Sequence, residues 1–73
     1  MNKKGFRLGA KQTGTPLGSH DHVLCELESS GELVILGSYI CPEYGFHEWL
    51  DCDTHDEVGL DIVSWQVIYK ESE

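Results

Sequence analysis

The most strongly β-prone stretch of the chain is Glu32-Leu33-Val34-Ile35-Leu36-Gly37-Ser38-Tyr39-Ile40. Apolar and β-branched side chains dominate it, as is typical of a strand at the centre of a sheet. Before it, residues 22–28 alternate between an apolar side and a side that carries two glutamates. The intervening Ser29-Ser30-Gly31 supplies a turn, because Gly31 can adopt a positive φ angle without steric cost. These two runs predict a β-hairpin.

Two further strands are expected after the hairpin. Residues 44–50 resume the alternation, and residues 60–69 form the last strand, with Trp65 among its apolar side chains. Between them, Thr54-His55-Asp56-Glu57 has the spacing of a helix capping box, so one helical turn is expected near residues 54–58. Gly37 inside the central strand indicates a bulge or a close approach, with a Trp side chain filling the space.

These elements predict a mainly β, single-domain protein built on a small antiparallel sheet. A chain of 73 residues holds one domain at most and buries a thin core. Sequential strands joined by short links mostly pair, so a four-strand meander is expected. Phe6 and Leu8 alternate with polar neighbours, which favours a short N-terminal edge strand. The expected organisation is a flexible basic arm (1–20), an acidic β domain (21–70) and a tail (71–73).

The charge is strongly negative and unevenly distributed. The net charge is -8, and four of the five basic residues lie at or before Lys11, so the thirteen acidic residues that follow face Lys70 alone. Such a field repels phosphate backbones and anionic membrane surfaces, so no direct binding to nucleic acid or membrane is expected. A basic protein partner is favoured.

Location and redox state follow from what the chain lacks. No apolar run approaches the roughly 20 residues of a membrane span, and the start of the chain has no secretion-signal core. Three cysteines cannot all pair within one chain, and they are too few for a disulfide framework. We expect reduced thiols and a cytoplasmic location.

Metal binding is one candidate chemistry. Thiol and imidazole groups of the kind zinc accepts recur at Cys41, His47, Cys52 and His55. Structural zinc sites use two close pairs, however, and only Cys52 and His55 are close here. The clustered carboxylates also lack the spacing of a calcium loop. No cofactor is therefore predicted, and a structural zinc module stays an alternative.

Catalysis is not expected. Cys52 with His55, or His47 with a neighbouring aspartate, could form a reactive pair only with an orienting group and an oxyanion site. The carboxylates around Cys52 would raise the pKa of its thiol and deplete the thiolate, which is the reverse of what a nucleophile needs.

Protein recognition through charge is the strongest functional signal. Seven carboxylates fall within nineteen residues, with aromatic side chains between them. Aromatics supply contact energy, while carboxylates steer a basic partner and accept hydrogen bonds from arginine. The predicted partner-binding residues are Glu43, Tyr44, Glu48, Asp51, Asp53, Asp56, Glu57 and Asp61.

The body of the chain also resembles a family. The residues that carry the likeness are Val23-Leu24-Cys25, Gly31, Gly37-Ser38-Tyr39, Trp49 and Ile62-Val63-Ser64-Trp65. They are similar to short phage and prophage proteins of unknown function that share a Val-Leu-Val strand, a Gly-x-Tyr strand and a closing Thr-His-Trp-Met-Pro segment. Here Ser64 and Gln66 replace the His and Met around the closing Trp, and the final Pro is absent. The resemblance implies a small β-rich fold and a mobile-element setting, and it transfers no site.

The leading hypothesis is a phage-type accessory protein without catalytic activity. It would bind and inhibit a basic, nucleic-acid-handling host protein by presenting carboxylates in place of phosphates. The further alternative is a homo-oligomeric structural protein, at its simplest a homodimer, whose thin core is completed by Trp49 or Trp65 of a neighbour.

Overall fold

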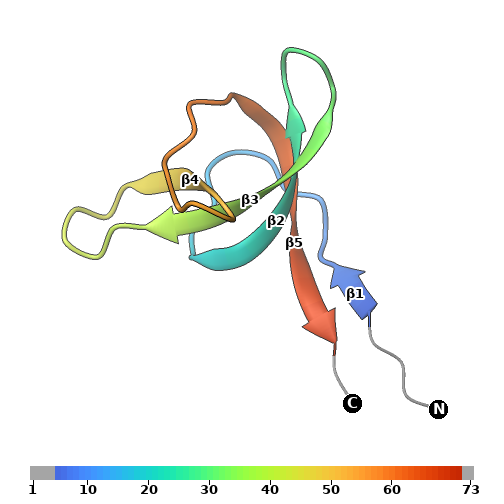
Figure 1. The fold of residues 1–73 in the computed structure, drawn as a ribbon, viewed down its shortest axis with the longest axis horizontal. Helices are drawn as coiled ribbons and strands as arrows, with labels where there is room; N and C mark the ends of the chain where they lie inside the picture. The colour runs from blue at the N-terminus through green and yellow to red at the C-terminus, as the bar shows by residue number, and fades with distance from the viewer. Residues whose placement is uncertain (1–4, 72–73) are drawn as a thin grey trace.

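The computed structural model describes residues 5–71 as five antiparallel strands in one open sheet. The order across the sheet is β1-β5-β2-β3-β4, and no helix occurs in this part of the chain (Figure 1). The predicted mainly β class, the single antiparallel sheet and the N-terminal edge strand are confirmed. The strands are β1 (Gly5–Leu8), β2 (His20–Leu27), β3 (Leu33–Ile40), β4 (His47–Asp51) and β5 (Ile62–Glu71).

The predicted hairpin is formed by β2 and β3. Val23 lies opposite Leu36 and Cys25 opposite Val34, so these four side chains share one face. Gly31 has a φ of 75°, and its amide donates to the Leu27 carbonyl at 2.8 Å. The β-prone pattern and the glycine at the turn therefore act together to set this register.

The meander prediction is wrong for the last strand. β5 does not pair with β4; it crosses to the far side of the hairpin and pairs with β2, where Cys25 lies opposite Trp65. The outer edge of β4 is instead used by the loop that follows it, since Leu50 bridges to Glu57 and the Val58 amide donates to the Trp49 carbonyl at 2.9 Å. With that edge occupied, the open edge of β2 receives β5.

The helical turn expected near residues 54–58 is also absent. The Asp51 carboxylate accepts hydrogen bonds from the amides of Asp53 and Thr54, at 2.7 and 3.1 Å, so Asp51 caps a tight turn before Thr54 can cap a helix. His55 then has a φ of 65°, a left-handed conformation that stops helix propagation. Glu57 then forms an isolated β-bridge with Leu50.

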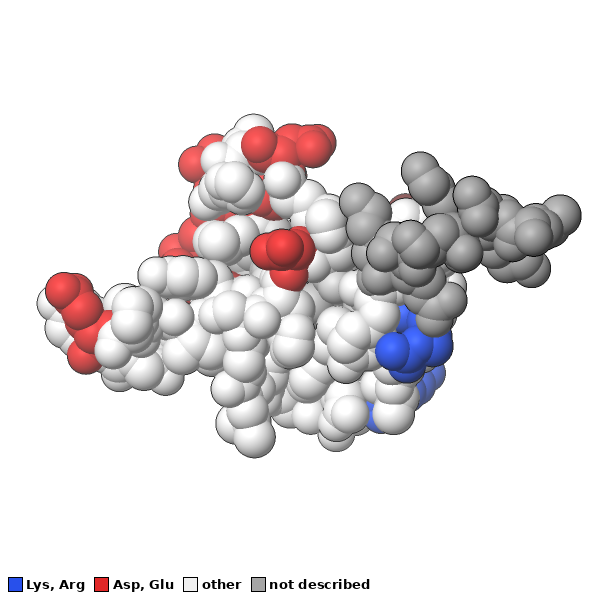
Figure 2. All heavy atoms as spheres, turned by 90° about the horizontal axis from the view of Figure 1, so that it is seen from below, with Lys and Arg blue, Asp and Glu red and all other residues white. Residues whose placement is uncertain are grey.

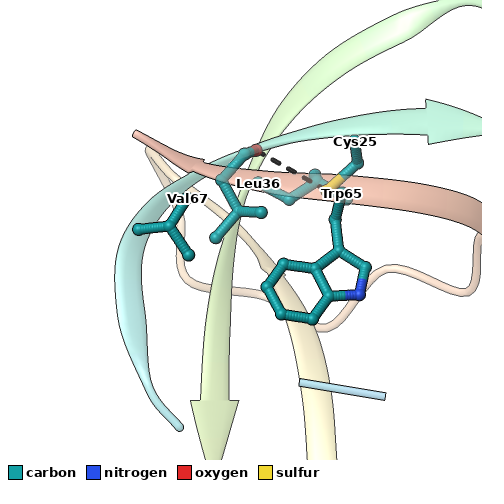
Figure 3. Packing of buried hydrophobic residues seen from close by; sticks show 5 residues of the cluster. Cys25, Leu36, Trp65 and Val67 are labelled. Carbon is teal, nitrogen blue, oxygen red and sulfur yellow. Dashed lines mark hydrogen bonds between the residues drawn. The ribbon is translucent and has the colours of Figure 1, made fainter. Parts of the chain in front are cut away.

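The core lies on one face of the sheet and is small. Figure 3 shows the Trp65 ring with the side chains of Val67 and Leu36 on the same side of the strands. Val23 and Cys25 are fully buried beside them. Trp49 packs edge-on against Trp65, with ring centroids 6.5 Å apart, so the two tryptophans complete the core within one chain. The partly buried residues packed against this cluster are Val34, Trp49, Val58 and Ile62.

Residues 9–19, the strap, connect β1 to β2 in the sequence and run beside β5 at their start. The amides of Gly9 and Gln12 donate to the carbonyls of Val67 and Trp65, each at 2.8 Å. The Trp65 indole Nε1 donates to the Gly14 carbonyl at 2.9 Å, and Pro16 is buried. The segment predicted as an arm thus pairs with β5 from residue 5 to residue 12. Residues 1–4, with Lys3 and Lys4, and tail residues 72–73 lie outside the described part, while Glu71 still pairs with Gly5.

Two smaller observations bear on the site. All three cysteines are free thiols. Residues 5–71 contain no apolar helix of membrane-spanning length.

Candidate functional site

The seven predicted carboxylates are distributed along β4 and its flanking loops, and they do not form one continuous patch. Glu43 lies in the β3–β4 turn, whereas Asp51 ends β4 four residues after His47 begins it, a span of roughly 14 Å in an extended strand. Asp61 lies beside the β2–β3 turn, where its carbonyl accepts the Glu28 amide at 3.0 Å. Figure 2 shows acidic side chains in separate groups on one face, one of them at the β3–β4 end, and basic side chains at the opposite end.

The densest group is the acidic turn, residues 51–57. Its geometry is fixed from within, because Asp51 accepts the two amide hydrogen bonds and its own amide donates to the Asp56 carbonyl at 2.8 Å. The hydrogen bonds from the Thr54 and Asp53 amides, together with the nearby His55, lower the pKa of Asp51. Asp51 therefore remains ionised at neutral pH, while the side chains of Asp53, Asp56 and Glu57 are exposed.

Asp21 joins the acidic turn from a distant part of the sequence. The Cys52 sulfur lies 3.7 Å from the Asp21 carbonyl oxygen, which brings the start of β2 beside the turn. Burial raises the pKa of the Cys52 thiol, and the charges of Asp51, Asp53 and Asp21 raise it further. A raised thiol pKa lowers the fraction of thiolate at neutral pH, which is unfavourable for a nucleophile. The sequence prediction omitted Asp21; its only signal was the polar run His20-Asp21-His22 at the start of an apolar strand.

His55 lies within the acidic turn and lowers the pKa of Asp51, whereas Lys11 and Arg7 make contacts elsewhere in the sheet. Lys11 pairs with Glu26 at 3.7 Å, and the Arg7 guanidinium lies 4.7 Å from the centre of the Tyr69 ring. Both basic residues are at the β1–β5 end of the sheet. The described part of the molecule is therefore polarised, with cationic side chains at one end and the acidic turn away from them.

The β3–β4 end has a different character. Tyr44 and Phe46 stack with centroids 5.9 Å apart, and their side chains are 75% and 50% exposed. Leu17 of the strap is 97% exposed, and a groove of about 580 Å³ runs between the strap and this hairpin. Exposed aromatic and aliphatic groups beside Glu43 provide contact area for a protein partner. Tyr44 and Glu43, predicted as site residues, belong to this second surface.

The candidate zinc ligands are separated in the same way. Cys41 and His47 flank the β3–β4 turn, while Cys52 and His55 lie in the acidic turn at the other end of β4. Within residues 5–71 no three His, Cys, Asp or Glu side chains are grouped so that they could hold a metal ion.

His47 has a structural partner. The Ser38 hydroxyl donates to the Gly18 carbonyl at 3.0 Å, so the His47 Nε2 is the donor in its 2.6 Å hydrogen bond to the Ser38 oxygen. Ser38 is 4% exposed, and its single proton is committed to the strap. Burial and the neighbouring His20 lower the pKa of His47. The Ser38–His47 pair therefore connects the strap to β3 and β4, and it is not arranged as a nucleophile with its base.

Comparison with known proteins finds no family model, no curated protein and no solved structure that matches the chain. The resemblance to phage proteins stays a prediction, and the acidic turn is the feature of the molecule from which a function can be inferred.

Proposed function

We propose that this protein binds a basic, nucleic-acid-handling protein through the acidic turn and blocks its nucleic-acid site. The setting we propose is that of a phage-type accessory protein acting on a host protein in the cytoplasm. The observation that carries the proposal is that the contact between the Cys52 sulfur and the Asp21 carbonyl oxygen, at 3.7 Å, brings exposed Asp21 beside the exposed carboxylates of the acidic turn, those of Asp53, Asp56 and Glu57. Carboxylates held at close spacing on a rigid turn can occupy the positions that phosphates take in a nucleic acid.

The aromatic surface at the β3–β4 end supports the same function in a different way. Charge steers association and sets specificity, whereas buried aromatic contacts supply most of the binding energy. A partner that spans from the acidic turn to Tyr44 and Phe46 would use both. Glu48, on β4 between the two surfaces, would lie within such an interface.

The test is affinity capture with two variants that change the net charge equally. One variant neutralises the acidic turn: Asp51→Asn, Asp53→Asn, Asp56→Asn and Glu57→Gln. The matched control changes the net charge by the same amount at and beside the β2–β3 turn: Glu28→Gln, Glu32→Gln, Asp61→Asn and Ser29→Lys. Each immobilised protein is incubated with nuclease-treated bacterial extract and eluted with a salt gradient.

The expected result is that the parent and the control retain the same basic proteins and that the acidic-turn variant does not. Retention should weaken as salt is raised, because screening shortens the range of charge interactions to about 3 Å at 1 M. The retained protein should lose affinity for its nucleic acid when the parent is added. If both variants retain the same proteins as the parent, the acidic turn is not the binding surface.

Self-association is a second candidate, and a specific observation favours it. The face of the sheet opposite the core exposes Phe6, Leu33 and Ile35, at 71%, 62% and 51%. Light scattering at several protein concentrations distinguishes the two candidates, since a dimer would double the molar mass. Trp65 does not contribute to such an interface, because it is 8% exposed within its own chain.

A further inference from the structure

A hollow of about 490 Å³ lies beside the acidic turn, between the start of β2, the middle of β3 and the end of β4. Gly37 and Tyr39 of β3 are part of its lining, and they belong to the face opposite the core because they alternate with Leu36 and Ser38. Cys52 completes the side nearest the acidic turn.

An irregularity in the sheet creates the hollow. Between the pairs His20–Ser38 and Val23–Leu36, two residues of β2 oppose Gly37 alone, so β2 carries a bulge there. The predicted bulge at Gly37 is thus present on the partner strand, and no Trp fills the space. A Cβ atom at position 37 would lie 3.5 Å from the Asp21 carbonyl oxygen and 3.7 Å from the Leu50 carbonyl oxygen. Because residue 37 is glycine, no side chain occupies this part of the hollow.

The lining contains the carboxylates of Asp21 and Asp51, three imidazoles, from His20, His22 and His55, and no Lys or Arg. The Asp21 carbonyl lies in the bulge, outside the regular pairing, and the Cys52 thiol 3.7 Å away is a weak donor. Asp51 uses Oδ1 for the two turn amides, which leaves Oδ2 for a ligand. Besides burial, the negative charges of Asp51, Asp53 and Asp21 raise the pKa of the Cys52 thiol. Acceptors, negative charge and the ring of Tyr39 together specify a cation with several N–H donors.

We propose that this hollow receives an arginine side chain of the basic partner, with its guanidinium donating to the Asp21 carbonyl and to the Asp21 and Asp51 carboxylates. This inference rests on the proposed function and identifies the group that the acidic turn recognises. Arginine fits better than lysine because its planar guanidinium offers five N–H donors in fixed directions and stacks on aromatic rings such as Tyr39. An ammonium group is strongly hydrated and presents a single point of charge.

The test is an NMR titration of the ¹⁵N-labelled full chain with a capped Gly-Arg-Gly peptide. Matched peptides carry citrulline, the neutral isostere, or lysine. The arginine peptide should shift the amide signals of Asp21, Gly37 and Cys52 saturably, the lysine peptide should bind several-fold more weakly, and the citrulline peptide should not bind.

Variants at Gly37 and Asp21 test whether the arginine side chain binds in the hollow. Gly37→Ala places a methyl group into the hollow at ordinary van der Waals distances, so the fold should be kept and the affinity for the arginine peptide should fall about tenfold, which corresponds to about 1.4 kcal/mol. Gly59→Ala is the control, because a Cβ there meets nothing within 4 Å, and it should bind like the parent. Asp21→Asn, at an exposed position, should also lower the affinity for the arginine peptide, and it adds no volume to the hollow.

Three results would overturn the inference: equal affinity of parent and Gly37→Ala, equal binding of the citrulline peptide, or shifts spread evenly over Glu43, Glu57 and Asp61. If any of these occurs while the acidic-turn variant still loses its captured proteins, the hollow is refuted and the proposed function stands. If the arginine peptide occupies the hollow but capture does not depend on the acidic turn, the hollow is supported as a binding site and the proposed function is refuted.

Discussion

Two segments without regular structure contact the core of this protein, and they are held in different ways. The strap is bonded through its backbone and by buried side chains, since Trp65 donates to Gly14 and Ser38 donates to Gly18. The loop after β4 is held by backbone bonds to β4 and by Val58, while its carboxylates face solvent. The difference suggests that the strap serves stability and the acidic turn is available for binding. Substitutions in the two segments should therefore have different effects.

The largest effect is expected at Trp65, to which the strap is bonded. Trp65→Ala removes a ring at the centre of the core and should cost about 3–5 kcal/mol, which is about the whole stability that a core of this size supplies. We expect the variant to be unfolded in circular dichroism. Trp65→Phe keeps most of the packing but leaves the Gly14 carbonyl without its donor, and should cost about 1–2 kcal/mol.

Val58→Ala is the matching change in the other segment. Val58 is only partly buried, so its truncation should cost about 1–2 kcal/mol and leave the chain folded. A Val58→Ala variant that is unfolded in circular dichroism, like Trp65→Ala, would show that the loop is as important for stability as the strap.

The second effect concerns the Ser38–His47 pair. Ser38→Ala leaves the Gly18 carbonyl without its hydroxyl donor and the His47 Nε2 without its acceptor, which should cost about 1–3 kcal/mol in chemical denaturation. Ser30→Ala, in the exposed β2–β3 turn, is the control and should change stability by less than about 0.5 kcal/mol.

The same pair should make stability depend on pH. Burial lowers the pKa of His47 in the folded chain, so the unfolded chain binds the proton first. The contribution of neutral His47 to stability is fully present above the ordinary histidine pKa of about 6.5. It is lost as the pH falls through the lower pKa of the folded chain. As the pH is lowered from about 7.5 to about 5.5, the thermal midpoint of unfolding should decrease. The decrease should be smaller in His47→Gln, because glutamine cannot titrate. An equal decrease in both proteins would assign the effect to the other histidines.

The contrast between the segments was only partly visible in the sequence. The hairpin could be predicted because alternation and a turn glycine are local signals. The strap resembled a loose arm because its glycines, threonines and serines carry little apolar surface. What holds it are backbone carbonyls such as those of Gly14 and Gly18, which no sequence pattern marks.

The site was predicted in its parts and not in its assembly. Asp51 and Asp53 were identified from local density of charge, whereas Asp21 lies thirty positions earlier and reaches them only through the bulge opposite Gly37. Glu43 and Asp61 were grouped with them because they are near in sequence, but β4 and the crossing to β5 separate them in space. Likewise, the pairing of β5 with β2 depends on which sheet edge is open, which is a property of the assembled fold.

A third prediction tests whether the acidic turn is dispensable for folding. The fourfold amide variant of residues 51, 53, 56 and 57 keeps an oxygen at Asp51→Asn that can still accept the turn amides. Its free energy of unfolding should therefore remain within about 0.5 kcal/mol of the parent. A loss as large as that of Ser38→Ala would mean that these carboxylates stabilise the fold, and the contrast between the two segments would fail.

The smallest effect is local to the acidic turn. Two amide hydrogen bonds lower the pKa of Asp51, so the bonded form is fully present above the ordinary aspartate value of about 3.9 and is lost as pH falls through the lower folded value. The amide signal of Thr54 should stay constant through the range in which exposed carboxylates titrate, and move only at lower pH. In Asp51→Asn this low-pH change should be absent. If the Thr54 amide instead moves together with the exposed carboxylates, Asp51 does not hold the turn, and the rigidity on which the binding surface depends is lost.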